Sequence, residues 1–223
     1  MSARDTVLAK IRSSMRVSGS EADRRKAVAS RLEDSPRGII PARAQLPKAG
    51  QVDLFCTMAE QFGATLKRVG DYKDVPAEVA AYLRSRNLPA EIRMGADKRL
   101  TKAKWDSEKN LEVRPGPSDG GDLAGVSHAM AGIAETGTVA LFSGQDNPTT
   151  INFLPEHHIV VLKAADIKGD MESVWTVVRK HQGKGEMPRA LNLVTGPSRS
   201  GDIEQTILLG AHGPRALHVI VVE

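Results

Sequence analysis

The sequence contains a single cysteine, Cys56, among 223 residues. One thiol cannot form an internal disulfide, and it cannot supply the roughly four thiolates that an iron–sulfur cluster needs. Any cysteine-ligated redox centre would therefore have to belong to a partner protein. The residues around Cys56, Val52–Met58, follow the pattern of an amphipathic helix, in which a buried and unreactive thiol is the usual case, so we assign Cys56 no catalytic role.

Long apolar runs are also missing. No stretch of about 18 apolar residues could span a bilayer, and the start, Met1–Asp5, lacks the apolar segment of a secretory signal. With 40% hydrophobic residues the chain can still bury a full core, and its length suits one α/β domain with an appended element. We therefore expect a cytoplasmic protein without membrane association.

The net positive charge of the chain comes from its N-terminal part. Residues 1–48 hold eleven Lys or Arg against five Asp or Glu, which gives +6 and leaves −2 for the remainder of a chain whose net charge is +4. Helical spacing is present over Thr6–Met15 and Glu21–Leu32, and three prolines then mark an extended connection. We predict a basic helical arm over residues 1–48 and an α/β domain over residues 49–223.

A basic arm can contact nucleic acid or an acidic partner. This one carries no aromatic residue for base stacking and no recognised nucleic-acid motif, so we do not expect a nucleic-acid partner. We expect instead that its apolar side chains pack on the core or on another subunit, with Arg and Lys in solvent. These side chains are Leu8, Ile11, Met15, Val28 and Leu32.

From residue 52 onward, helical and strand patterns alternate, which predicts an α/β fold. The expected helices are Val52–Phe62, Pro76–Arg86, Asp166–His181 and a short one over Asp202–Gly210; the expected strands are Thr65–Val69, Glu91–Met94, Leu111–Val113, two segments within Ala131–Phe142, Ile159–Leu162, Leu191–Val194 and Leu217–Val222. The glycine-rich stretch Gly116–Asp122 is expected to be a flexible loop.

Three motifs occur in a characteristic order: Ala-Glu-Thr-Gly-Thr-Val at residues 134–139, Leu-Pro-Glu-His-His-Ile-Val-Val at 154–161, and Thr-Gly-Pro-Ser-Arg-Ser-Gly-Asp-Ile-Glu at 195–204. With these motifs the chain resembles the lactate-utilization protein C family, which carries the LUD domain, over roughly Asp122 to the C-terminus. Ser200-Gly201 departs from the Thr-Ala expected there. The resemblance implies the fold of ribose-phosphate isomerases and coenzyme A transferases, a mostly parallel sheet flanked by helices.

Glu135 is the candidate catalytic residue. A lone carboxylate just ahead of the apolar run Val139–Phe142 is placed where strand propensity would not put it. In coenzyme A transferases of this fold a glutamate forms a covalent acyl intermediate, so the analogy would make Glu135 a nucleophile or base. The alternative is structural: Glu135 accepts hydrogen bonds from backbone N–H groups of the adjoining Thr-Gly-Thr turn and fixes two strand ends.

The turn after Leu191–Val194 is the candidate anion site, because backbone N–H groups and a forked guanidinium can both hold a carboxylate or phosphate. Two acidic residues that follow, Asp202 and Glu204, would oppose a multiply charged anion. In the alternative interpretation, Ser200 or Asp202 caps the predicted helix together with Gln205, and the arginine forms a salt bridge to the acidic residues. The candidate ligand residues are Gly196, Pro197, Ser198, Arg199 and Ser200.

The six histidines do not suggest a metal site. His157 and His158 are adjacent, so along a strand they would point in opposite directions, and His212 and His218 lie six residues apart across a turn. We expect His212 to cap the end of the predicted helix before it. No Gly-x-Ser-x-Gly elbow, Walker-type loop or dinucleotide fingerprint occurs.

Two functions from different classes follow. The resemblance implies a subunit of a system that oxidises L-lactate to pyruvate, with the iron–sulfur clusters on partner proteins, no cofactor bound by this chain alone, and a small carboxylate as the ligand of the turn. The alternative is a self-sufficient enzyme of the coenzyme A transferase or sugar-phosphate isomerase type that uses Glu135. A third hypothesis is a regulatory binding module that acts through the basic arm.

Overall fold

The computed structural model describes residues 2–203 and 206–223. The chain divides into two compact units, Met1–Ile39 and Ile40–Glu223, and each is described separately below. None of the described helices combines the length and the apolar character needed to cross a bilayer.

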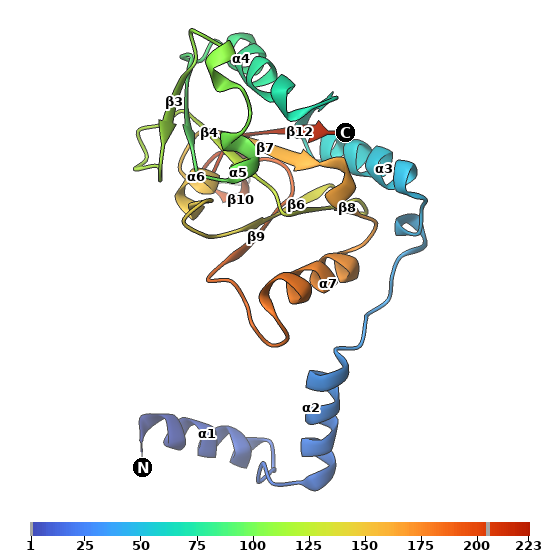
Figure 1. Cartoon of the computed structure of the whole chain (residues 1–223). Coiled ribbons are helices and arrows are strands. Elements are labelled where there is room, and N and C mark those ends of the chain that lie inside the picture. Colours follow the sequence, from blue (N-terminus) through green and yellow to red (C-terminus); the bar gives the residue numbers. More distant parts are fainter. Residues whose placement is uncertain (1, 204–205) are drawn as a thin grey trace. The chain divides into compact units, whose positions relative to one another are not determined.

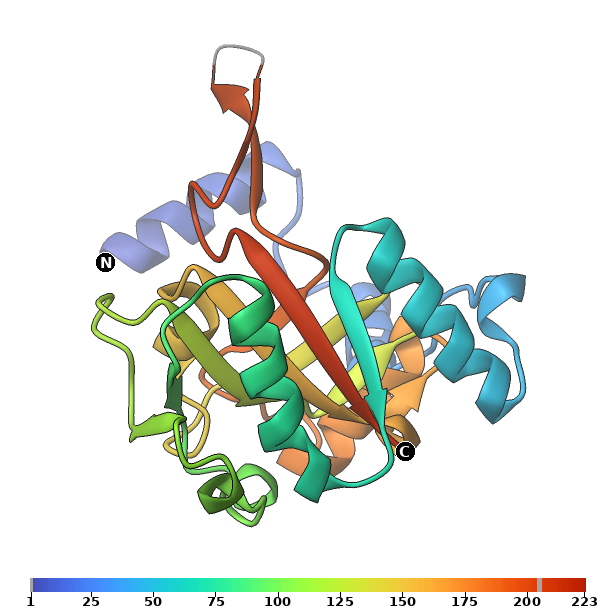
Figure 2. The same cartoon turned by 90° about the horizontal axis from the view of Figure 1, so that it is seen from above.

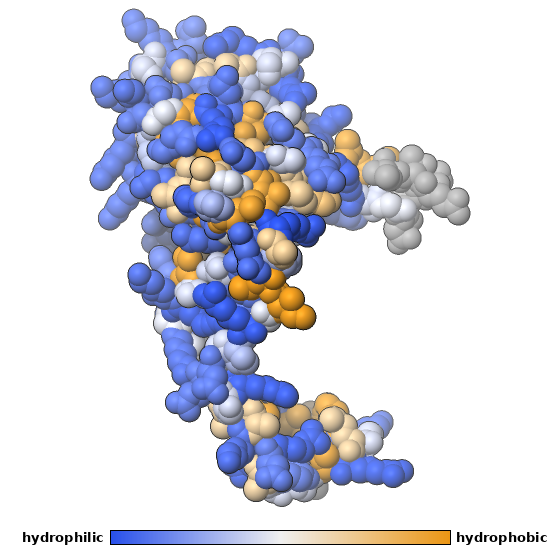
Figure 3. Space-filling view, turned by 90° about the vertical axis from the view of Figure 1, so that its right-hand side faces the viewer, coloured by the Kyte–Doolittle hydropathy of each residue, from blue (hydrophilic) through white to orange (hydrophobic). Residues whose placement is uncertain are grey.

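The first unit consists of two helices, α1 (Ala3–Ser14) and α2 (Ala22–Asp34), which confirms the two helical segments predicted there. Ser2 begins α1 with a capping box, since its hydroxyl accepts a hydrogen bond from the Asp5 N–H at 3.2 Å and its own N–H donates to the Asp5 carboxylate at 3.0 Å. No described residue of either helix is buried; Val28 is 53% and Leu32 72% exposed. Figure 3 shows apolar side chains at the surface of the molecule between charged ones.

The second unit is built on a six-stranded sheet in which all neighbouring strands are parallel. Its order is β1-β12-β7-β4-β2-β3, with β1 at Thr65–Val69, β12 at Ala216–Val222, β7 at His157–Lys163, β4 at Ala124–His128, β2 at Glu91–Met94 and β3 at Glu112–Pro115. The central strands β12 and β7 are continuous apolar runs, because helices or a second sheet cover both of their faces. In Figure 2 β12 is the long red strand beside β1.

A second, four-stranded sheet has the order β8-β5-β6-β9. Its strands are β8 (Ile167–Lys168), β5 (Ala131–Ile133), β6 (Thr138–Phe142) and β9 (Leu191–Val194). β5 and β6 form an antiparallel hairpin whose turn contains Glu135, as the sequence predicts for the two strand segments of this region. The expected α/β class, with a mostly parallel main sheet flanked by helices and a helical N-terminal region, is therefore confirmed.

Helices cover the outer faces of the two sheets and also pack at their common edge (Figure 1). Helix α4 (Val75–Ser85) packs on one face of the large sheet, α7 (Met171–Gln182) packs on the small sheet, and α3 (Lys48–Gln61) contributes to the core between the two sheets. The shorter helical segments are Ala42–Ala44, Tyr72–Asp74, Lys98–Thr101 (α5), Trp105–Ser107, Thr149–Phe153 (α6) and Ala164–Asp166.

The helix predicted over Asp202–Gly210 is wrong. β10 (Arg199–Ile203) and β11 (Thr206–Leu209) form an antiparallel hairpin there, with Arg199 opposite Leu209. It projects from the rest of the unit in Figure 2. The β-branched residues of this stretch, among them Ile203 and Thr206, favour an extended chain.

Two capping roles depended on that helix. His212 has no helix before it to cap, because it follows strand β11, and Ser200 lies within β10. The proposed partner of Asp202, Gln205, lies outside the described residues, as does Glu204.

Candidate functional site

The turn between β9 and β10 opens onto a cavity of about 290 Å³. The cavity lies where the end of β9 approaches the starts of β7 and β12, so the large and the small sheet both contribute to it. Four of the predicted ligand residues line it together, Gly196, Pro197, Ser198 and Arg199, whereas Ser200 does not. The remaining lining comes from Asn152, Phe153, His158, Leu193, Val194, Thr195, His212, Gly213, Pro214 and Leu217.

Gly196 and Arg199 hold the turn against the C-terminal end of α3. Gly196 has φ +68°, and a Cβ atom there would lie 2.2 Å from the carbonyl oxygen of Phe62. The guanidinium of Arg199 donates a hydrogen bond to the same oxygen at 2.8 Å. A cation is stabilising at a helix C-terminus, where carbonyl groups lack partners within the helix. Both residues therefore have a structural role that the sequence did not reveal.

The backbone N–H of Ser198 is not available to an anion, because it donates to the carbonyl oxygen of Pro214 at 2.9 Å. Two side-chain groups of the turn can serve a ligand: the hydroxyl of Ser198, which lines the cavity, and the donors of Arg199 that do not bond to Phe62. The salt bridge proposed as an alternative would join Arg199 to Asp202 or Glu204, whose side chains lie outside the described part of the structure.

Two polar side chains are buried on the inner side of the cavity. His158 is 0% and Asn152 1% exposed, and both contact the hydroxyl of Ser127 on β4. Ser127 donates its only hydroxyl hydrogen to the Asn152 Oδ1 atom at 2.9 Å, so its oxygen accepts from His158 Nε2–H. Burial lowers the pKa of His158 to about 3, which keeps the ring neutral. Nδ1 of this ring is consequently an acceptor.

Neither of these side chains is fully satisfied. Among the described residues, His158 Nδ1 and Asn152 Nδ2 have no hydrogen-bond partner. One is an acceptor and the other a donor, and both residues line the same cavity. Buried polar groups are satisfied in nearly all proteins, so each exception calls for an explanation.

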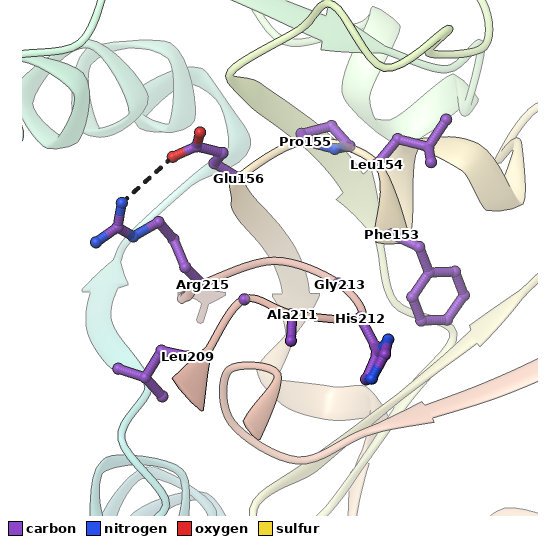
Figure 4. A pocket seen from close by; sticks show the side chains of 10 residues that line it. Phe153, Leu154, Pro155, Glu156, Leu209, Ala211, His212, Gly213 and Arg215 are labelled. Atoms are coloured by element: carbon purple, nitrogen blue, oxygen red, sulfur yellow. Dashed lines mark ion pairs between the residues drawn. The ribbon is translucent and has the colours of Figure 1, made fainter. Parts of the chain in front are cut away.

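A second, more open pocket of about 570 Å³ adjoins the first (Figure 4). The two share Phe153, His212 and Gly213, so these residues lie at the boundary between the two pockets. Arg215 and Glu156 lie on the other side of the outer pocket, 3.6 Å apart and both exposed, so their ion pair contributes little to stability.

Glu135 lies elsewhere. Its side chain is 8% exposed and accepts a hydrogen bond from the Met171 N–H, at the first turn of α7, at 2.9 Å. A carboxylate there satisfies a backbone donor that has no partner within the helix and complements the helix dipole. The Glu135 N–H also donates to the carbonyl oxygen of Gly169 at 3.0 Å. Glu135 thus ties the β5–β6 hairpin to α7 and does not line the cavity.

Sequence reasoning missed a cluster at the carboxyl ends of the parallel strands. His128 ends β4; its Nδ1–H donates to the Ala129 carbonyl at 2.6 Å, and its Nε2 accepts from the Tyr72 hydroxyl at 2.8 Å. Arg99 binds both carboxylate oxygens of Asp97 nearby, at 3.0 and 2.7 Å. Burial, and then the charge of Arg99, lower the pKa of His128 to about 4. The position of this cluster could have suggested a site, because ligands of open α/β sheets bind outside the carboxyl ends of the strands.

The other sequence candidates have plainer surroundings. His157 and His158 bond to different elements, Tyr82 of α4 and Ser127 of β4, as expected for adjacent strand residues. The described residues contain no group of three His, Cys, Asp or Glu side chains placed to hold a metal ion. Cys56 is half-buried in α3, and burial raises the pKa of its thiol.

Comparison with a solved structure supports the fold. The crystal structure of a DUF162 family protein from Deinococcus radiodurans matches 80% of this chain and 99% of that one, with a TM-score of 0.56 and 23% sequence identity. At this identity the likeness concerns the fold alone.

Sequence comparison is more specific. The LUD domain profile matches residues 122–222. "Lactate utilization protein C" of Geobacillus kaustophilus is 31% identical over 177 residues, which cover 75% of this chain and 71% of that protein. Its namesake from another Geobacillus strain is 32% identical over 136 residues, and there the match spans about half the relative's length, 56%. Because the profile and the long alignment agree, the chain belongs to the LUD-domain family.

Proposed function

We propose that this chain is a component of a lactate-utilization system. The observation that carries the proposal is the alignment with the lactate utilization protein C of G. kaustophilus, which spans most of both chains. In this proposal the chain acts in the cytoplasm with iron–sulfur partner proteins, which remove electrons from L-lactate as pyruvate forms. The single cysteine supports this division of labour, since a cysteine-ligated cluster needs more thiolates than this chain can provide.

The cavity behind the turn is where this chain would contribute to such a system. It is small, it carries a cation at its mouth in Arg199, and it holds hydrogen-bonding groups inside. These are the features of a site for a small carboxylate rather than for a large apolar ligand.

The test combines genetics with purification. Deleting the gene from the source cells should abolish growth on L-lactate but not on glucose, and the wild-type gene should restore it. The tagged chain, purified from lactate-grown cells under anaerobic conditions, should bring down iron-rich partners with visible cluster absorbance. Unimpaired growth on lactate, together with recovery of the chain alone and free of iron, would overturn the proposal.

Glu135→Gln separates this proposal from an enzyme that uses Glu135. Glutamine keeps an oxygen that can accept the Met171 N–H hydrogen bond, so the fold should persist. Growth on lactate should therefore survive this substitution. A folded Glu135→Gln protein that fails to support growth would instead indicate that the carboxylate takes part in the chemistry, and trapping an acyl adduct on Glu135 would then be the next experiment.

The basic arm can be tested as a partner-binding element by deletion. The deletion should remove residues 1–39 only, because the next residues belong to the second unit. Ala44 is buried there, and its carbonyl oxygen packs so closely against Gly169 that a Cβ atom on that glycine would lie 2.1 Å from it. Loss of the partner complex with the second unit still folded would assign binding to the arm. Retention of the complex would place the contact on the second unit.

A further inference from the structure

Two buried, unpaired atoms belong to side chains that line the cavity, and they define what a ligand that reaches them must provide. His158 Nδ1 accepts and needs a donor; Asn152 Nδ2 donates and needs an acceptor. Leaving either one buried without a partner is unfavourable. An apolar ligand would leave both unsatisfied, and a simple carboxylate such as acetate could satisfy only the donor.

The size and charge of the cavity narrow the choice further. At about 290 Å³ it is near the lower end of the range for ligand pockets, so it favours a small ligand. Arg199 and the Ser198 hydroxyl line the same cavity and offer donors to an anionic group. A fitting ligand therefore carries a hydroxyl hydrogen, an acceptor oxygen close to it, and a negative charge.

We propose that this cavity binds a 2-hydroxycarboxylate, with the ligand hydroxyl donating to His158 Nδ1, an adjacent ligand oxygen accepting from Asn152 Nδ2, and the carboxylate directed toward Arg199 and Ser198. The recognition chemistry follows from the cavity itself. The choice of L-lactate as the probe rests on the proposed function.

The arrangement predicts a preference for the hydroxy acid over the corresponding oxo acid. Pyruvate has the carboxylate but no hydroxyl hydrogen, so in its complex the acceptor His158 Nδ1 would face the lone pairs of a carbonyl oxygen. Sites built to hydrogen-bond a hydroxyl discriminate strongly against analogues that lack it, because a buried group is left unpaired. We expect L-lactate to bind roughly 10- to 100-fold more tightly than pyruvate.

The experiment is titration calorimetry on the full-length chain with L-lactate, pyruvate and acetate. It is paired with ¹⁵N NMR of the histidine rings, in which His158 Nδ1 should shift when lactate binds and stay unchanged with acetate. His158→Phe should abolish the preference for lactate. Arg199→Gln, at an exposed position, should weaken lactate and pyruvate by similar factors and keep their ratio. Arg114→Gln, at the distant edge strand β3, is the matched control and should change neither affinity.

The outcomes separate the possibilities. Equal binding of lactate and pyruvate, or an unshifted His158 resonance, would overturn the role of His158. No binding of any of the three acids would overturn the proposal, and the cavity would then hold ordered water only. If His158→Phe does not fold, the NMR shift and the Arg199→Gln ratio still decide. If none of the acids binds but deletion of the gene impairs growth on lactate, the proposed function stands and the ligand site is rejected. If lactate binds but the deletion strain grows normally on lactate and the chain is recovered alone and free of iron, the proposed function is rejected and the ligand site stands.

Discussion

Replacing Gly196 with alanine tests whether the cavity turn is held against α3 as the structure has it. An alanine at φ +68° costs about 1–2 kcal/mol, of which a less flexible unfolded chain offsets about 0.4–1. The new Cβ would lie 2.2 Å from the Phe62 oxygen, so turn and helix must separate by about 1 Å. That movement breaks the hydrogen bond from Arg199, worth about 1.5–3 kcal/mol. We expect a total loss of about 2–4 kcal/mol.

Urea unfolding measures this loss, and two other glycines separate its causes. Gly120 has φ +100° with no atom within 4 Å of the position that a Cβ would take, so Gly120→Ala reports the backbone term alone, about 1 kcal/mol or less. Gly201 also has open space and no positive φ, so Gly201→Ala should leave stability within about 0.5 kcal/mol. If Gly196→Ala falls within about 1 kcal/mol of Gly120→Ala, the close approach to Phe62 has no energetic weight and the reasoning fails.

Two further predictions concern buried histidines. Folding lowers the pKa of His128 and His218 from 6.5 to about 4, and that of His158 from 6.5 to about 3. The unfolded chain therefore binds more protons as the pH falls, and the unfolding free energy should decrease by about 4 kcal/mol between pH 7.5 and 5.5. A urea midpoint that does not change over this range would contradict the prediction. Tyr72→Phe leaves buried His128 Nε2 without its donor and should cost about 1–3 kcal/mol in urea unfolding, whereas Tyr82→Phe, whose partner is half-buried, should cost less. Equal losses would show that burial of the partner does not decide the cost.

The sequence predicted those strands whose apolar pattern and flanking turn residues favour the conformation that they adopt in the fold. β1 and β2 have the predicted bounds, and β12 is one residue longer, because apolar patterning and turn residues bound each of them. β4 was missed: Ala-Gly-Val-Ser-His has weak strand propensity, and it is a strand because β2 and β7 pair with its two edges. The 202–210 segment failed for a related reason, since its polar residues resembled a helix cap while its β-branched residues decided the conformation.

For the candidate site, the motif at residues 195–204 predicted the position of the turn but not the polar side chains buried behind it. Gly196 to Arg199 stand together in the sequence and line one cavity in the structure. Asn152 and His158 could not be found in this way, because their importance lies in single unpaired atoms, and Ser127, which orients them, comes from a strand 25 and 31 residues away in the sequence. Burial of particular atoms depends on the packing of three separate elements, which no local pattern encodes.

The place of β12 between β1 and β7 has a consequence for biosynthesis. Chains emerge from the ribosome N-terminus first, at about 5–20 residues per second, so β1 must wait roughly 8–30 seconds for the strand that pairs with it. During that time β1 presents an unpaired strand edge, and β7 does so as well once it has been synthesised; unpaired strand edges promote aggregation. The large sheet can close only after the segment through Val222 has been synthesised. We therefore expect nascent chains of this protein to be clients of chaperones that shield exposed strand edges.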